Sequence, residues 1–124
     1  MKYIAVEFEF VSDRRLGKVV DLLQSKGFDF NHDGPWGDGY LHSCQLYESK
    51  EDTEAEISYF LDCLESFSAE VQADFREARG KVADSGFTEE RGTELFCLRH
   101  TISLPLLKRM VEWDLSLAFS NYSD

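Results

Sequence analysis

The chain has 124 residues, a length that fits one domain over residues 1–124 and allows a core without disulfide staples. With 43% hydrophobic and 14% aromatic residues it is too apolar for a disordered chain, yet no apolar run is long enough to cross a bilayer. The formal net charge of −11 disfavours binding to nucleic acid or anionic membranes and favours a basic partner.

Residues 3–12 predict a strand, and the residues after them predict a helix. Apolar and polar residues alternate in YIAVEFEFVS, as in a half-buried strand with one wet face. The side chains expected to face inward are Ile4, Val6, Phe8 and Phe10. Apolar residues then recur at helical spacing from Leu16 to Leu23, and Gly27 ends this helix.

Residues 28–48 predict two strands joined by a long turn. Phe28 to Phe30 is a short strand candidate, and residues 40–48 resume a strand-like pattern. Three glycines and one proline fall within residues 34–39, a composition typical of loops. We therefore expect a loop over residues 31–39 with Trp36 at an exposed tip.

The acidic centre of the chain predicts its longest helix, from Thr53 to about Gly80. Residues 53–56 have a T-x-x-E pattern, in which the Thr53 hydroxyl and the Glu56 carboxylate would bind the first backbone amides of the helix. An apolar stripe with a period near 3.6 continues to Ala78.

The last third of the chain predicts a loop, a strand, a helix and a final strand. Residues 81–92 are polar and contain glycine, which indicates a loop, whereas residues 94–103 alternate like a strand. Pro105 suits the first turn of a short helix, and residues 114–121 alternate again. The helix residues expected to face inward are Leu106, Leu107, Met110 and Val111.

These elements follow the order β-α-β-β-α-β-α-β. Strands joined as hairpins and mixed with helices predict an α+β fold, with an antiparallel sheet of about five strands and two to three helices packed on one face. The first six elements match a ferredoxin-like arrangement.

We expect a cytoplasmic protein that is not an enzyme and binds no cofactor or metal. Acids interrupt the N-terminal segment too early for a signal-peptide core. Cys44, Cys63 and Cys97 are odd in number and widely spaced, which argues against a disulfide framework and a zinc cluster. Motifs for phosphate loops, nucleophile elbows and zinc proteases do not occur.

The C-terminal third carries a family resemblance. Residues 100–110 read HTISLPLLKRM, and residues 115–122 read LSLAFSNY. A strand that leads into a Ser-x-x-Leu-Leu helix start, followed by an alternating strand ending in Tyr, resembles the end of the bacterial domain of unknown function 4279 family. Small acidic α+β domains of this kind recur as immunity proteins in bacterial toxin systems. The resemblance implies a protein that neutralises a basic toxin domain, such as a nuclease, by occlusion, and it supplies no functional residue.

The exterior of the 53–79 helix is the first candidate binding surface. Nine acids and one base lie between Glu48 and Asp74, a stretch that carries −8 of the net charge. Acids on this exterior would attract a basic partner, which an exposed aromatic side chain would anchor. The candidate partner-binding residues are Glu56, Tyr59, Asp62, Cys63, Glu70 and Asp74, together with Trp36 in the 29–39 loop. The alternative is a solvated helix whose first acids complement the helix dipole.

A small ligand- or metal-binding domain or enzyme is the second hypothesis. It would use the 29–39 loop, His42 and His100, and Cys44 would join the two histidines if their strands were neighbours. Histidines that are packed or hydrogen-bonded in the structure are the competing interpretation.

Two further features leave other functions open. Glu7 and Glu9 share the wet face of the first strand, as a carboxylate pair for acid–base chemistry would. A homodimer formed through a sheet edge is the remaining alternative for an interaction module.

Overall fold

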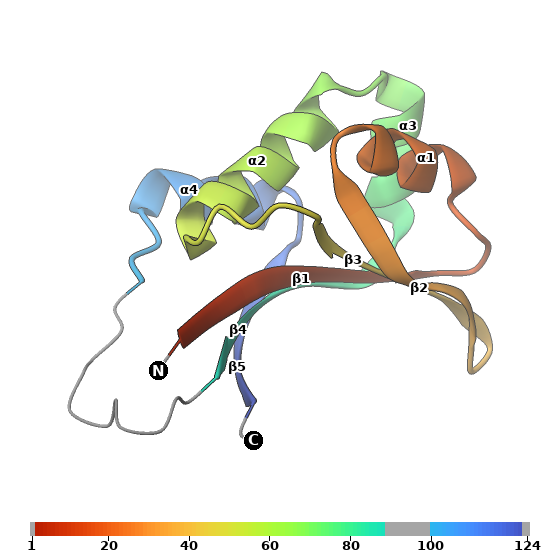
Figure 1. Ribbon diagram of the computed structural model, residues 1–124. Coiled ribbons are helices and arrows are strands. Elements are labelled where there is room, and N and C mark those ends of the chain that lie inside the picture. Colours follow the sequence, from red (N-terminus) through yellow and green to blue (C-terminus); the bar gives the residue numbers. More distant parts are fainter. Residues whose placement is uncertain (1, 89–99, 123–124) are drawn as a thin grey trace.

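Four helices lie on one face of a five-stranded sheet in the computed structural model, which describes residues 2–88 and 100–122 (Figure 1). The strands are β1 (Lys2–Ser12), β2 (Phe28–Trp36), β3 (Gly39–Leu46), β4 (Arg79–Thr88) and β5 (Ser116–Tyr122). The helices are α1 (Gly17–Ser25), α2 (Thr53–Ser66), α3 (Ala69–Glu77) and α4 (Leu104–Glu112). The predicted α+β class with helices on one face is confirmed, but there are four helices rather than two or three.

The sheet has the order β2-β3-β1-β4-β5. The central strand β1 pairs antiparallel with β3 and β4, and β2 pairs antiparallel with β3. Among the described strands only β4 and β5 pair in parallel, and the crossover connection that a parallel pair needs contains α4. The sheet is therefore mixed, whereas the sequence predicted an antiparallel one.

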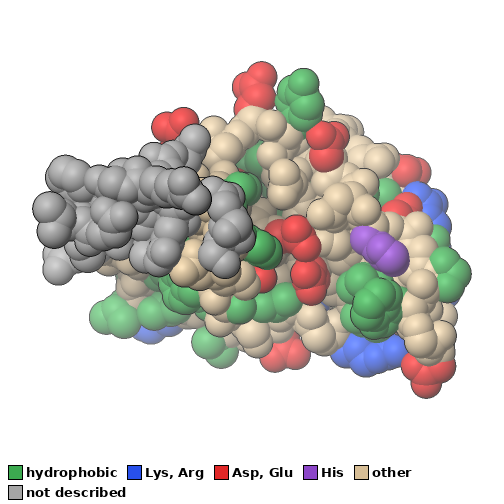
Figure 2. Space-filling model, turned by 60° about the horizontal axis from the view of Figure 1, so that its bottom comes forward, with side chains coloured by type: hydrophobic (Ala, Val, Ile, Leu, Met, Phe, Trp, Pro, Cys, Tyr) green, Lys and Arg blue, Asp and Glu red, His purple; other side chains and the backbone are tan. Residues whose placement is uncertain are grey.

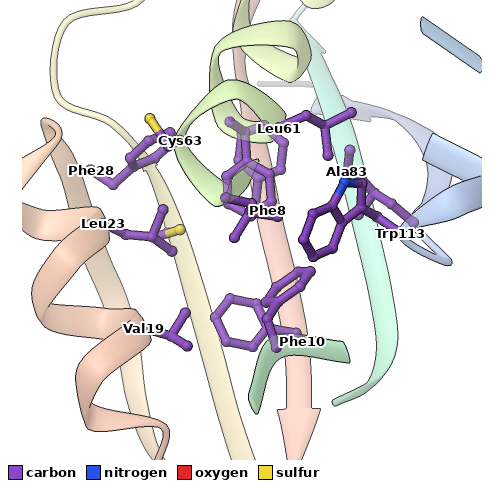
Figure 3. Close-up of a cluster of buried hydrophobic side chains, with 14 of the residues drawn as sticks. Phe8, Phe10, Val19, Leu23, Phe28, Leu61, Cys63, Ala83 and Trp113 are labelled. Carbon is purple, nitrogen blue, oxygen red and sulfur yellow. The ribbon is translucent and has the colours of Figure 1, made fainter. Parts of the chain in front are cut away.

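The side of β1 that faces the helices forms the centre of the core. Phe8 and Phe10 are fully buried there, and alternate residues of a strand share one face. The Phe8 ring stacks on Phe60 of α2 with centroids 4.0 Å apart, and Phe10 packs edge-on against Phe75 of α3 at 5.1 Å (Figure 3). Each fully buried ring contributes about 1.5–3 kcal/mol.

The start of β1 departs from the predicted alternation. A register shift between Tyr3 and Ala5 adds one residue to β1 opposite β4. The side chains of β1 before this shift therefore point to the face of the sheet opposite to the predicted one. Ile4, expected in the core, is therefore 44% exposed, while Tyr3 packs against the core.

Two predicted loops are strands. Residues 31–36 continue β2, so that the turn is only Gly37 and Asp38, and β4 occupies most of the predicted 81–92 loop. Of the strand predicted over residues 94–103, the part up to residue 99 lies outside the described residues, and residues 100–103 form no strand.

The long helix predicted from Thr53 to Gly80 is two helices. α2 ends at Ser66, and Phe67 and Ser68 have extended backbone. The Ser68 hydroxyl then accepts the Val71 amide at 3.4 Å and caps α3, because an N-cap oxygen satisfies an amide of the first turn.

The predicted capping box is also wrong. Asp52, not Thr53, caps α2, and its Oδ2 accepts the Ala55 amide at 2.9 Å. Thr53 and Glu56 are instead buried against the sheet.

Candidate functional site

Two residues of the predicted helix exterior lie inside the protein. Cys63 is buried near Phe28 (Figure 3), and Glu56 is fully buried, where the Tyr3 hydroxyl donates to Glu56 Oε2. Burial raises the pKa of Glu56 above its ordinary value. The prediction that both side chains are on the exterior is wrong, because α2 uses this side to pack on β1.

Four acids of the helix layer form ion pairs within the chain. The pairs are Arg109 with Asp62 (2.7 Å) and Glu65 (3.0 Å), Lys18 with Glu70 (3.1 Å), and Arg14 with Asp74 (3.1 Å). Each base comes from outside residues 48–74. The charge of −8 counted over that segment therefore overstates the negative field around these helices. Exposed pairs of this kind contribute little stability, but they do compensate charge.

The two predicted aromatic anchors have different surroundings. The Tyr59 hydroxyl donates to the Lys26 carbonyl at 2.7 Å, and its ring stacks on Phe28 with centroids 5.8 Å apart. Trp36 is 60% exposed at the hairpin tip, as expected, and contacts His32 edge-on. Trp36 is therefore the more accessible of the two.

The structure does not bring His42 and His100 together. His42 is fully buried and stacks on Phe10, whereas the His100 ring lies against Tyr3. Tyr3 and Phe10 are seven positions apart along β1, a distance of roughly 20 Å. Within residues 2–88 and 100–122, no group of three or more His, Cys, Asp and Glu side chains is arranged to hold a metal ion.

His42 has a structural role. Its Nε2 accepts the Leu16 amide at 3.2 Å, and its Nδ1 lies 3.3 Å from the Phe10 carbonyl, which assigns the proton of a neutral ring to Nδ1. Burial lowers the pKa of His42 and favours this neutral form. Both ring nitrogens of His42 therefore form hydrogen bonds within the protein.

A second acidic cluster lies on the face of the sheet that the helices leave uncovered. Figure 2 brings this side forward and shows acidic side chains near its middle, with hydrophobic side chains around them. Glu7 of β1 is directly opposite Asp84 of β4, and Glu9 lies two residues farther along on the same face. We call Glu7, Glu9 and Asp84 the sheet-face carboxylates.

Neutral donors hold the sheet-face carboxylates in place. The Ser43 hydroxyl and the Asn31 amide donate to Glu7 at 2.8 and 3.2 Å. The Ser120 hydroxyl donates to Asp84 Oδ2 at 2.8 Å, while Asp84 Oδ1 is buried without a partner. Among the residues whose side chains the structure describes, no Lys or Arg forms an ion pair with these three acids.

The electrostatics of this cluster differ from those of the helix layer. Burial, a hydrogen bond with Glu7 and the negative charges of Glu7 and Asp84 raise the pKa of Glu9. Like charges directly opposite in a sheet destabilise it. The cluster is therefore suited to receive a cationic group, which would relieve the repulsion.

The sequence indicated only part of this cluster. The alternation of β1 placed Glu7 and Glu9 on one wet face, which the structure confirms. Asp84 was missed because residues 81–92 were expected to form a loop. Only the β1–β4 register brings it opposite Glu7.

No helix in the described ranges 2–88 and 100–122 is long and apolar enough to cross a membrane. Comparisons of the chain with protein-family models, with curated proteins and with solved structures gave no match.

Proposed function

We propose that this chain is an acidic binding protein whose sheet-face carboxylates receive Lys or Arg side chains of a basic protein partner. The supporting observation is the contrast between the two acidic surfaces. Four helix-layer acids, Asp62, Glu65, Glu70 and Asp74, have basic partners within the chain, whereas the described bases leave Glu7, Glu9 and Asp84 without one. A guanidinium group suits such a site, because it donates several hydrogen bonds to carboxylates in a fixed geometry.

Aromatic side chains on both sides of the carboxylates would extend the contact. Trp36 and Tyr122 are both more than half exposed, and the strand register places both on the uncovered face. A Cβ built on Gly86 of β4 would lie 3.1 Å from the Tyr122 ring, so this ring covers the sheet beside Asp84. Tyr and Trp are enriched at protein interfaces, where they often supply much of the binding energy.

The partner class that we propose is the catalytic domain of a bacterial toxin, such as a nuclease. The chain would act as a cytoplasmic immunity protein that neutralises the toxin by occlusion and would itself need no catalytic residue or cofactor. Support comes from the net charge of −11 and from the resemblance of residues 100–122 to the 4279 family. Proteins that bind nucleic acid present basic surfaces, which an acidic face complements.

We further propose that the first strands and helices belong to a ferredoxin-like arrangement extended by α4 and β5. The order β2-β3-β1-β4, with antiparallel neighbours throughout, supports it. Such an arrangement hosts many functions, so the functional argument rests on the surface and not on the fold.

Two variants of equal net charge test this function. One is Glu7→Gln/Glu9→Gln/Asp84→Asn on the sheet face, and the other is Asp62→Asn/Glu70→Gln/Asp74→Asn on the helix layer. Each removes three negative charges and brings the net charge from −11 to −8. Binding kinetics are measured against the purified basic protein encoded beside this gene.

We expect both variants to associate more slowly than the unmodified chain, because long-range attraction depends on net charge. Only the sheet-face variant should also dissociate faster, by about tenfold or more, because only it removes contacts of the bound state. Equal dissociation rates for the two variants would exclude the sheet face as the binding site.

A further inference from the structure

We infer that two copies of this chain associate through their β5 strands. β5 is an edge of the sheet and, in the described part of the chain, pairs only with β4. Within residues 2–88 and 100–122, no strand lies beside its outer backbone N–H and C=O groups. Such an edge is a template for pairing with another strand. The backbone edge of β5 is a different surface from the sheet face, although Ser120 and Tyr122 of β5 also lie beside the sheet-face carboxylates, so the inference goes beyond the proposed function.

β5 lacks the features that usually protect an edge strand. Its sequence SLAFSNY contains no charged residue and no proline, and its register with β4 is uninterrupted. The opposite edge, β2, carries Asp29, Asp33 and Pro35, and a register shift at Asn31. Charges, proline and bulges prevent pairing at an edge. β5 is thus the edge that remains available.

Pairing of β5 with its own copy is geometrically self-complementary. A two-fold axis makes the two edge strands antiparallel and places the same patch on both copies. Phe119 is the middle residue of Ser116–Tyr122, so an axis through it sets the two Phe119 side chains opposite each other. The Phe119 ring is 58% exposed in the single chain, and this contact would cover it.

α4 extends the apolar surface beside β5. Leu104, Leu107 and Val111 are exposed, which corrects the prediction that Leu107 and Val111 face the core. With 3.6 residues per turn these three side chains share one face of α4. Arg109, which binds Asp62 of α2, lies on a different face, so the apolar face points away from α2.

The C-terminal end of α4 lies close to the start of β5 along the chain. α4 is joined to β5 by only three residues, Trp113 to Leu115, and its buried side faces the core through Leu106 and Met110. When two β5 strands pair, the two α4 helices lie on the same side of the joined sheet.

The absence of charge on β5 argues against a basic partner at this edge. Each copy carries −11, so two copies repel each other overall, and an uncharged edge opposes their contact least. β5 has no charge that a basic partner would recognise. Added salt should therefore strengthen this association, because it screens the repulsion between copies. The same salt should weaken binding of a basic protein at the sheet face.

Sedimentation equilibrium of the full chain at low and high salt tests the inference. We expect a monomer–dimer equilibrium that shifts toward the dimer as NaCl rises from about 0.05 to about 0.5 M. Phe119→Lys should weaken association at least about tenfold, since it places two like charges together. Its net charge is less negative than that of the unmodified chain, so greater overall repulsion cannot explain a loss.

Trp36→Lys is the matched control, because it makes the same change at an exposed aromatic side chain on the hairpin far from β5. It should retain the dimer, and so should the sheet-face variant Glu7→Gln/Glu9→Gln/Asp84→Asn. A chain that stays monomeric at both salt concentrations, or equal weakening by Phe119→Lys and Trp36→Lys, would overturn the inference.

Cross-linking tests the same contact with a smaller change. Phe119→Cys should form a disulfide-linked dimer under mild oxidation, because the axis places the two thiols opposite each other. Tyr47→Cys, at an exposed site outside the strands, serves as the control, and the unmodified chain gives the baseline for the native cysteines. Equal cross-linking of the two cysteine variants would also overturn the inference.

Discussion

Glu56 joins the start of β1 to the first turn of α2 through a buried carboxylate. The Tyr3 hydroxyl and, at 3.4 Å, the Ser49 hydroxyl donate to its Oε2, while Oε1 has no partner. The N-terminus of a helix favours negative charge, but burial dominates and raises the pKa of Glu56. The ionised form therefore destabilises the fold at neutral pH.

We expect Glu56→Gln to become more stable relative to the unmodified chain as the pH rises. The folded-state pKa of Glu56 lies above the unfolded value. The contribution of Glu56 to the free energy of unfolding is thus fully present below its pKa in the unfolded chain. It is lost as the pH rises through its pKa in the folded protein. Gln keeps the shape of the side chain and does not ionise. Urea unfolding between about pH 4 and pH 8 measures the difference, and a difference independent of pH would contradict this account.

At the scale of elements, the break between α2 and α3 depends on one hydroxyl. Ser68→Ala removes the oxygen that accepts the Val71 amide, and loss of an N-cap costs about 0.5–2 kcal/mol. Urea unfolding should show this loss for Ser68→Ala. Ser66→Ala is the matched control, because the Ser66 hydroxyl donates to the Cys63 carbonyl within α2 and caps no helix. Equal losses for the two variants would show that the cap is not responsible.

Sequence periodicity identified the elements that have one buried and one wet face. α1 and the part of β1 after its register shift followed it, because their apolar residues recur with the period of the element, whereas β5 was found as a strand although it has no buried residue. β4 gave no such signal although it lies inside the sheet. Its helix-facing positions include Lys81 and Ser85, where an alternating pattern would place apolar residues.

The buried Lys81 illustrates why the sequence of β4 was predicted to form a loop. Its ammonium group donates to the Arg76 carbonyl at 3.1 Å and lies over the Phe75 ring, contacts that only the fold creates. For the same reason the sequence predicted two of the three sheet-face carboxylates and not Asp84. Alternation within one strand shows which of its residues share a face. A cluster of residues from several strands also depends on the register between those strands.

At the scale of the whole molecule, the fold divides the net charge of −11 between two unlike surfaces. Four described acids of the helix layer are held by Arg109, Lys18 and Arg14, which come from other elements. The sheet face concentrates three acids among neutral donors. Repulsion among Glu7, Glu9 and Asp84 lowers the stability of the fold, so we attribute their presence on one face to function.

This division predicts opposite stability changes for two variants of equal net charge. Glu7→Gln/Glu9→Gln/Asp84→Asn should raise the free energy of unfolding at neutral pH and low salt, by about 0.2–1 kcal/mol for each like-charge contact removed. Asp62→Asn/Glu70→Gln/Asp74→Asn should lower it by at most about 1 kcal/mol per ion pair. Because both variants reach −8, overall repulsion changes equally, and the difference between them reports local contacts.

Denaturant unfolding at low and high salt measures both changes, which should shrink as salt screens the charges. A sheet-face variant that is more stable yet binds its partner less tightly would show that these carboxylates serve binding at the expense of stability. If that variant is instead less stable than the unmodified chain, the hydrogen bonds from Ser43, Asn31 and Ser120 outweigh the repulsion. The three acids would then be part of the structural framework of the sheet, and the proposed binding site would lose its energetic basis.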